Sequence, residues 1–168
     1  EGQYKVVAGG IDYAYMIDKY NRDANVITVS ASGANAGYVN YWNEKIFASD
    51  CTTIKGKNEL ETKYIYNYLK SVPHIMESFK KGAAQPHVYP DDIKSIPIPI
   101  VPEDVQKKIV NECEKADKEF ETAKNSIIDL KNQIDKLFNE EIQSSNALKI
   151  RLDDTNKFKL SIGNRVLK

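Results

Sequence analysis

Few residues in this sequence have the types and spacing that enzymatic chemistry requires. The two histidines, His74 and His87, lie outside any HxxxH or CxxC pattern, so the sequence predicts no zinc site. The carboxylates are scattered, without the Asp…Glu-x-Lys grouping typical of nucleases. No GxSxG motif, no glycine motif for S-adenosylmethionine and no Asn-Pro-Pro-aromatic motif occurs. We therefore expect no catalytic residue, no metal site and no cofactor in this chain itself.

One glycine-bearing segment, Ser32–Gly37, follows a strand-like run and invites comparison with a phosphate-binding loop. It lacks the lysine of the GxxxxGK[ST] motif, and the residues after it are typical of a strand instead of a helix. We predict a tight connection between two strands. An enzyme in its own right stays open as a third hypothesis, which retention of a nucleotide or S-adenosylmethionine during purification would support.

The remaining polar signals are typical of binding. Lys80 and Lys81 precede Gly82, and two cations beside a flexible glycine can reach phosphates. Gln85 can make a bidentate contact to adenine in the major groove. The alternative is an ordinary polar loop, which composition alone favours. Aromatic and basic residues also alternate between Tyr13 and Arg22, a pattern common on plain protein surfaces. The candidate DNA-binding residues are Lys19, Arg22, Ser32, Asn35, Lys80, Lys81, Gln85 and His87.

Charge and composition bound the class of protein. The 24 basic and 24 acidic residues balance, which argues against the uniformly basic surface of a non-specific nucleic-acid coat. Cys51 and Cys113 have no CxxC spacing and fit a reduced cytoplasmic protein, with a disulfide between them left open. No apolar run approaches the roughly 18 residues of a membrane span, and the sequence shows no signal-peptide pattern. The sequence begins on a strand-like segment without Met, so we expect a fragment of a longer protein.

All ten tyrosines and the single tryptophan precede residue 90, and this first part predicts an α+β fold with a mixed sheet. Strands are expected at residues 4–8 and 26–29. Residues 38–42 and 46–48 predict a hairpin that turns at Asn43-Glu44. Apolar spacing predicts a helix over residues 59–72, with Leu60, Tyr64, Tyr68, Leu69 and Val72 on one face. Pro73 should interrupt it before a short helical turn at residues 74–79.

A cluster of prolines at residues 97, 99 and 102 marks the predicted end of this domain, because prolines so spaced suit an extended edge segment. Pro102 suits the first turn of a helix, with Glu103 and Asp104 near its positive end. A heptad repeat follows, and its seam consists of Ile109, Cys113, Ala116, Phe120, Ala123, Ile127, Leu130, Ile134 and Leu137.

This seam predicts a coiled-coil helix of roughly 60 Å at about 1.5 Å per residue. A partner helix should come from this chain, a second copy or another subunit; the alternative is a long helix packed on its own domain. The expected organisation is a domain at 1–101, a spacer helix at 102–142, and a basic tail at 143–168. The tail either packs back on the domain or extends from it, and it carries a strand near 158–162.

Six segments, taken in order, carry a resemblance to a known family. They are GQYKVVAGG (2–10), VITVS (26–30), SGANAGYV (32–39), KGAAQPHV (81–88), DIKSIPIP (92–99) and PEDVQKKIV (102–110). With the heptad helix that follows, they resemble the specificity subunits of type I restriction–modification systems and the related recognition domains of type II enzymes. The resemblance covers residues 2–142.

The resemblance implies a target-recognition domain that binds double-stranded DNA and reads a short sequence. It implies a spacer helix that pairs antiparallel with a second helix, from a second recognition domain or a second copy. A partner methyltransferase subunit or domain would use S-adenosylmethionine to methylate an adenine, with or without an associated nuclease. Base-contacting residues vary in this family, so the resemblance assigns none here.

Two features depart from the family. Full specificity subunits carry two recognition domains, and this chain carries one. Residues 158–168 are more similar to the end of a single-chain adenine methyltransferase with a fused recognition domain, so the parent is either a separate subunit or a fused enzyme. A different hypothesis is a protein-interaction module that works through the long helix.

Overall fold

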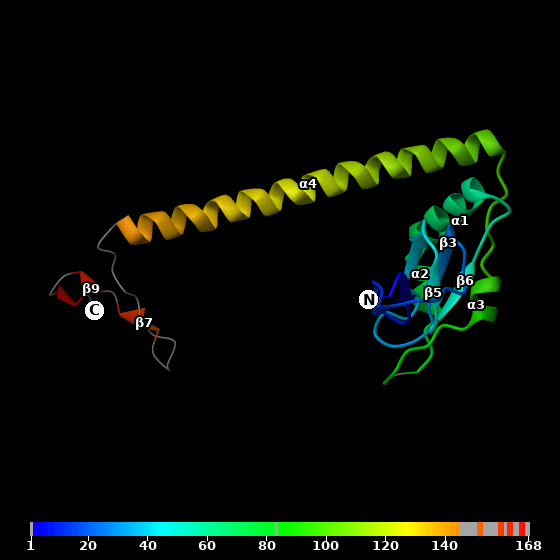
Figure 1. Cartoon of the computed structure of the whole chain (residues 1–168), viewed down its shortest axis with the longest axis horizontal. Helices are drawn as coiled ribbons and strands as arrows, with labels where there is room; N and C mark the ends of the chain where they lie inside the picture. The colour runs from blue at the N-terminus through cyan, green and yellow to red at the C-terminus, as the bar shows by residue number, and fades with distance from the viewer. Residues whose placement is uncertain are drawn as a thin grey trace. The chain divides into compact units, whose positions relative to one another are not determined.

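The computed structural model describes residues 2–82 and 84–144, together with four two-residue strands nearer the C-terminus. The chain divides into two compact units, residues 1–116 and 117–168. Figure 1 shows the elements of the first unit and the long helix that leaves it. In chain order the elements are β1 (Tyr4–Val7), β2 (Tyr15–Ile17), β3 (Val26–Ser30), β4 (Val39–Trp42), β5 (Ile46–Ala48), β6 (Cys51–Ile54), α1 (Glu59–Ser71), α2 (Pro73–Ser78), α3 (Pro90–Lys94), α4 (Glu103–Ser144), β7 (Arg151–Leu152), β8 (Phe158–Lys159), β9 (Ser161–Ile162) and β10 (Arg165–Val166).

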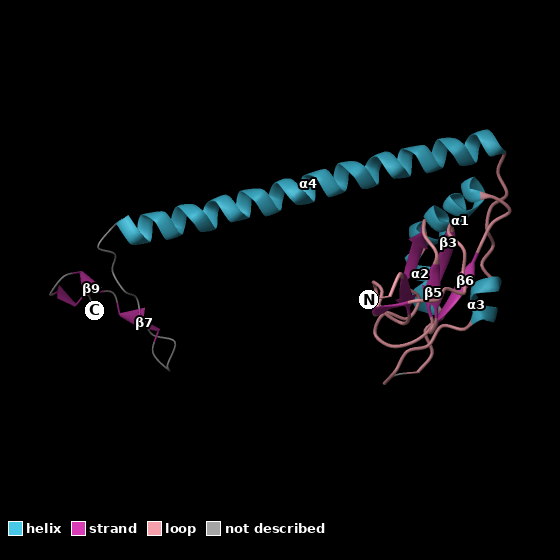
Figure 2. Ribbon diagram, in the orientation of Figure 1, coloured by secondary structure: helices cyan, strands magenta, loops and turns pink. Residues whose placement is uncertain are grey.

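Two three-stranded sheets form the first unit, which confirms the predicted α+β class (Figure 2). In one sheet β3 lies between β4 and β6, and both pairings are antiparallel. In the other, β1 lies between β2, which is antiparallel to it, and β5, which is parallel to it. The second sheet is therefore mixed, as the sequence predicted.

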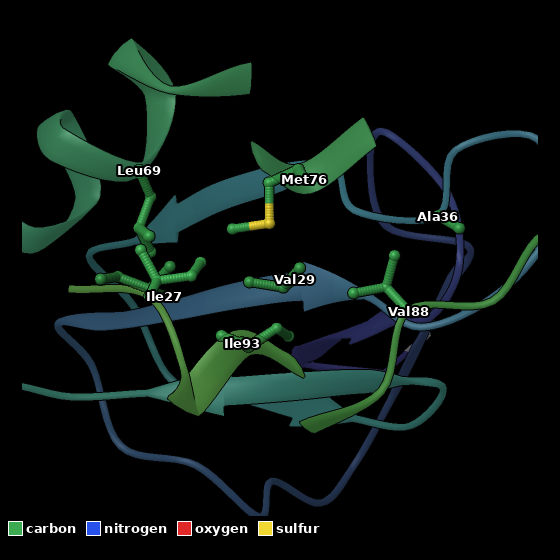
Figure 3. Packing of buried hydrophobic residues seen from close by; sticks show 8 residues of the cluster. Ile27, Val29, Ala36, Leu69, Met76, Val88 and Ile93 are labelled. Carbon is green, nitrogen blue, oxygen red and sulfur yellow. The ribbon is translucent and has the colours of Figure 1, made fainter. Parts of the chain in front are cut away.

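Strand β3 is buried along its whole length. Since alternate residues of a strand point to opposite faces, its side chains serve two separate cores. On one face Ile27 and Val29 pack against Leu69 of α1 and Met76 of α2, and Figure 3 shows both helices directing these side chains toward the strand. Ile93 of α3 joins the same cluster.

The opposite face of β3 meets the mixed sheet. Val26 packs with Val7, Trp42 and Ile46 in a second buried cluster. The Trp42 indole donates a hydrogen bond of 2.9 Å to the Thr28 hydroxyl, which satisfies both polar groups between the sheets. The first unit is thus layered, with helices on one side of the β3 sheet and the mixed sheet on the other.

The predicted hairpin of residues 38–42 and 46–48 is wrong. Both strands exist, but β4 pairs with β3 whereas β5 pairs with β1. Ile46 is fully buried between the sheets, and its main chain bonds with Arg22 in both directions at 3.1 Å. The chain therefore crosses from one sheet to the other after Trp42. The sequence prediction also missed β2 and β6.

Helices α1 and α2 match their predicted positions, and Pro73 separates them as the first residue of α2. Asn58 caps α1, accepting a 2.8 Å bond from the main-chain N–H of Glu61. The buried residues of α1 are Thr62, Tyr64 and Leu69, while Leu60, Tyr68 and Val72 of the predicted face are half-buried.

The proline-rich segment is held along α1. Tyr64 and Tyr68 donate hydrogen bonds of 2.9 Å to the carbonyls of Pro99 and Pro97, respectively. Residues four apart on a helix are about 6 Å apart along its axis, close to the roughly 6.6 Å between alternate residues of an extended chain. The spacing of the tyrosines thus matches the spacing of the prolines. The segment is neither helix nor central strand, as predicted, and within the described residues it does not pair at the edge of a sheet.

The start of α4 is fixed on the same helix. The ammonium of Lys63 lies 2.8 Å from the Glu114 carboxylate and 3.0 Å from that of Glu59. The hydrogen bond to Glu114, followed by that to Glu59, raises the pKa of Lys63 above its ordinary value. Val110 of α4 is buried. The first intrahelical bond runs from the N–H of Gln106 to the carbonyl of Pro102, one residue before the helix begins.

The predicted long helix is confirmed, and α4 extends two residues beyond its expected end. Its seam is exposed through the second unit: Phe120 and Ile127 are each 66% exposed, and Leu130, Ile134 and Leu137 are exposed as well. Ile109 and Cys113 are less exposed. The seam therefore has no partner helix within the described residues of this chain.

Both cysteines are free thiols, and burial raises the pKa of Cys51. The expected strand near residues 158–162 corresponds to β8 and β9, which pair with β7 and β10, respectively. Most of the predicted basic tail, residues 143–168, lies outside the described residues. None of the described helices is long and apolar enough to span a membrane.

The double-sided burial of β3 predicts a sharp difference between two isoleucines. Ile27→Ala should lower the free energy of unfolding by about 2–5 kcal/mol, because it leaves a cavity at a fully buried site. Ile11→Ala, at a site that is 54% exposed, should change it by less than about 0.5 kcal/mol. Urea unfolding of the full chain measures both, and equal losses would contradict the described core.

Candidate nucleic-acid interface

Two loops that are distant in sequence meet at the end of β3. The β3–β4 loop, residues 31–38, is bonded to the segment at residues 80–88. The N–H of Gly33 donates to the carbonyl of Pro86 at 3.0 Å, and the N–H of Val88 donates to that of Ala31 at 2.9 Å. The prediction of a tight connection between two strands at Ser32–Gly37 is confirmed.

The second loop is closed by its own short ladder. The main chains of Lys81 and His87 exchange hydrogen bonds of 2.9 and 2.8 Å. Gly82 has a φ of +98°, and a Cβ there would lie 2.7 Å from the carbonyl oxygen of Gln85. The loop that carries Gln85 is therefore narrow, and glycine is required at its start.

Ser32 and His87, both candidate residues, have different side-chain partners. Its hydroxyl donates a short hydrogen bond directly to the carboxylate of Asp50. The ring of His87 instead lies against Tyr89, with 6.2 Å between ring centroids. The bond to Asp50 joins the β3–β4 loop to the turn before β6.

Both candidate lysines are held by carboxylates. Lys80 lies 2.6 Å from Glu77 and Lys81 lies 2.8 Å from Asp92. The Lys81 ammonium also lies 5.4 Å from the centroid of Tyr89. Exposed ion pairs contribute roughly 0–1 kcal/mol, so a phosphate could replace either carboxylate at little cost.

The structure separates the eight candidate residues into two groups. Six of them, Ser32, Asn35, Lys80, Lys81, Gln85 and His87, belong to the two loops. Arg22 instead donates a 3.0 Å bond to the Thr53 hydroxyl of β6, and Lys19 lies 5.4 Å from the ring of Phe47 on β5. Neither contact involves the two loops, and we expect Arg22 and Lys19 to contribute less to binding.

Sequence analysis missed four residues that shape this surface, namely Asp50, Glu77, Tyr89 and Asp92. Glu77 lies three residues before Lys80, a spacing that predicts a pair only where a helix is already assumed. Asp50 meets Ser32 only because β6 pairs with β3, which the local sequence does not reveal. In the described residues no group of three or more potential ligands is placed to hold a metal ion.

Comparison with known proteins identifies the family of the chain. Residues 1–132 match the family described as the type I restriction modification DNA specificity domain. A putative type I specificity subunit of Mycoplasma pneumoniae is 30% identical over 104 residues, which cover 60% of this chain and 28% of that protein. One from Mycoplasma genitalium is 31% identical over 102 residues, covering 59% and 26%, respectively.

A solved structure is similar over more of the chain. The crystal structure of a type I restriction–modification S subunit from M. genitalium matches with a TM-score of 0.65 and 26% identity, covering 84% of this chain and 38% of that one. This chain therefore spans less than half the length of the relatives it matches.

Two glycines of the β3–β4 loop predict a matched pair of effects. Gly33 and Gly37 have φ values of +79° and +83°, which cost an alanine about 1–2 kcal/mol. A Cβ at Gly33 would meet open space, whereas one at Gly37 would lie 3.3 Å from the Cβ of Met76. Gly37→Ala should therefore lower the free energy of unfolding more than Gly33→Ala in urea titrations. Equal losses would show that the loop does not pack on α2 as described.

Proposed function

Because the chain belongs to the family of type I restriction modification DNA specificity domains, we propose that it recognises a short sequence in duplex DNA and directs a methyltransferase to it. The main support for this proposal is that two polar loops are hydrogen-bonded to each other at the end of one buried strand. Both loops lie within the residues that match the family. The loops combine cations, which can hold phosphates, with amide side chains, which can read base edges.

The charges of the chain favour sequence-specific over non-specific binding of DNA. The chain has a formal net charge of zero, and Lys80 and Lys81 are paired internally. DNA must therefore compete with Glu77 and Asp92 for these lysines. Binding should depend on a close fit at the loops and fall steeply as salt rises.

The chemistry belongs elsewhere in the assembly that we propose. S-adenosylmethionine would bind to the methyltransferase subunit or domain, and this chain would perform no reaction itself. The working compartment would be the cytoplasm, where the DNA and the methyltransferase meet. A protein-interaction module alone accounts for the helix but leaves the two loops without a role.

The exposed seam of α4 calls for a second helix, from a second recognition domain or from another copy of this chain. The three small seam residues, Cys113, Ala116 and Ala123, all precede Ile127, and every seam residue from Ile127 onward is large, a distribution that suits antiparallel pairing of two copies. Opposing Ala123 to Ile127 places Ala116 opposite Ile134 and Phe120 opposite Leu130. A parallel in-register pair would oppose each alanine to itself and leave voids.

Substitutions of opposite sign test the DNA interface. Lys81→Ala should weaken binding to all duplex sequences similarly and lower the slope of log affinity against log salt by about one. Asp92→Asn should strengthen binding, because it releases the Lys81 ammonium for a phosphate. Fluorescence polarisation with a labelled random-sequence duplex measures both.

Lys124→Ala is the matched control, since Lys124 is an ion-paired lysine of α4 outside the two loops. It should leave affinity and salt slope unchanged. If the wild type binds no duplex at low salt, or if Lys81→Ala and Asp92→Asn shift affinity in the same direction, the proposal fails.

The seam predicts a separate effect on assembly. Phe120→Asp combined with Ile127→Asp should abolish pairing of the chain with its partner helix, because two carboxylates would enter the apolar interface. Analytical ultracentrifugation of the full chain measures self-pairing. Asn125→Asp with Asn132→Asp adds the same charge on the opposite face of α4 and should leave assembly intact. Binding of the loops to DNA should survive both pairs of substitutions, unless the helix is the sole working part.

A further inference from the structure

A cavity of about 410 Å³ lies beside the two loops, between the β3–β4 loop and helices α1 and α2. This volume falls within the roughly 300–1,000 Å³ that is typical of sites for small organic groups. Leu69 and Met76, which are 1% and 3% exposed, contribute its apolar floor. Both come from the helices that Figure 3 shows over β3. The floor therefore belongs to the buried core of the first unit.

The rim of the cavity is polar and faces the candidate interface. Asn35 and Tyr38 line it from the β3–β4 loop, and Lys80 lines it from the other loop. The side-chain amide of Asn35 makes no hydrogen bond within the described part of the chain, so its donor and acceptor are available. Tyr38 is 42% exposed and offers a ring face at the mouth.

We propose that this cavity receives one unstacked base of the bound DNA, an inference that rests on the proposed function. A base has apolar faces and a polar edge, and the cavity has an apolar floor and a polar rim to match them. The floor of Leu69 and Met76 accepts a ring face, and Tyr38 can stack against the base. The Asn35 amide pairs with the edge of the base, most favourably with adenine.

The position of Lys80 favours a base of a polynucleotide over a free metabolite. Its ammonium stands at the rim beside Glu77, where it can meet the phosphate that follows the inserted base. The cavity also adjoins the loop that carries Lys81 and Gln85, which would hold the neighbouring duplex. A free nucleobase would use the floor but none of these outer contacts.

Extrusion of a paired base costs a few kcal/mol, and less when its partner is missing. The chain should therefore prefer a duplex in which one adenine faces an abasic site. Using the full chain and labelled random-sequence duplexes, we expect at least tenfold tighter binding to the abasic duplex than to the fully paired one. Ala34 lines the mouth and is exposed, so Ala34→Phe should block entry without disturbing the core, and should reduce the preference to less than twofold.

Ala14→Phe is the control, because Ala14 is also exposed but does not line this cavity; it should keep the tenfold preference. Asn35→Ala leaves the cavity open and should lower the preference by removing the amide alone. A wild type that binds both duplexes equally, or an Ala34→Phe variant that keeps the preference, overturns the inference while leaving the proposed function intact.

A second measurement separates the two proposals if no duplex binds. Titration with deoxyadenosine monophosphate, followed by ¹H–¹⁵N spectra, should shift the amides of residues 34–39 in the wild type and not in Ala34→Phe. Such shifts support a base-binding cavity even where duplex binding fails. Their absence at millimolar nucleotide, or shifts only elsewhere, overturns it.

Discussion

The burial of β3 on both faces is the constraint from which the rest of the first unit follows. A strand with no solvent-facing side requires a layer on each side, and here α1, α2 and α3 cover one face while the mixed sheet covers the other. The same strand holds both loops at its end, since Ser30 bonds with residues 37 and 38, and Ala31 accepts from Val88. The loops of the candidate interface are therefore held by β3, a strand buried along its whole length, and recognition sites need such firm support.

The sequence predicted those elements that local patterns determine. The apolar run of β3, the spacing of α1, the break at Pro73 and the heptads of α4 each encode their structure within a few turns or residues. The crossing after Trp42 could not be predicted in this way. It depends on the parallel pairing of β5 with β1, whose residues lie about forty positions apart in the register that joins Lys5 to Ile46. The exposed strand β2 was missed because it lacks the alternation of a half-buried strand.

In the candidate site, too, local patterns could be predicted and tertiary contacts could not. The lysines, Gln85 and His87 could be singled out because their types suit DNA and they lie close together in sequence. Their partners could not, since Lys81 meets Asp92 and Ser32 meets Asp50 only through tertiary structure. These carboxylates change the expected mode of DNA binding. A surface whose cations are already paired attracts DNA weakly at long range, so binding depends on close contacts. Close contacts differ between DNA sequences, which favours sequence discrimination over non-specific affinity.

The contacts between α1 and the start of α4 give the two parts of the long helix different roles. Near its start, Lys63 and the buried Val110 attach α4 to the first unit. Seam exposure rises from 38% at Ile109 to 66% at Phe120, so the apolar stripe is most exposed after the attached part ends. A partner helix would therefore cover most of its area beyond Cys113. Substitutions at Phe120 or beyond can thus act on assembly alone, whereas those near Val110 would also disturb the unit that carries the loops.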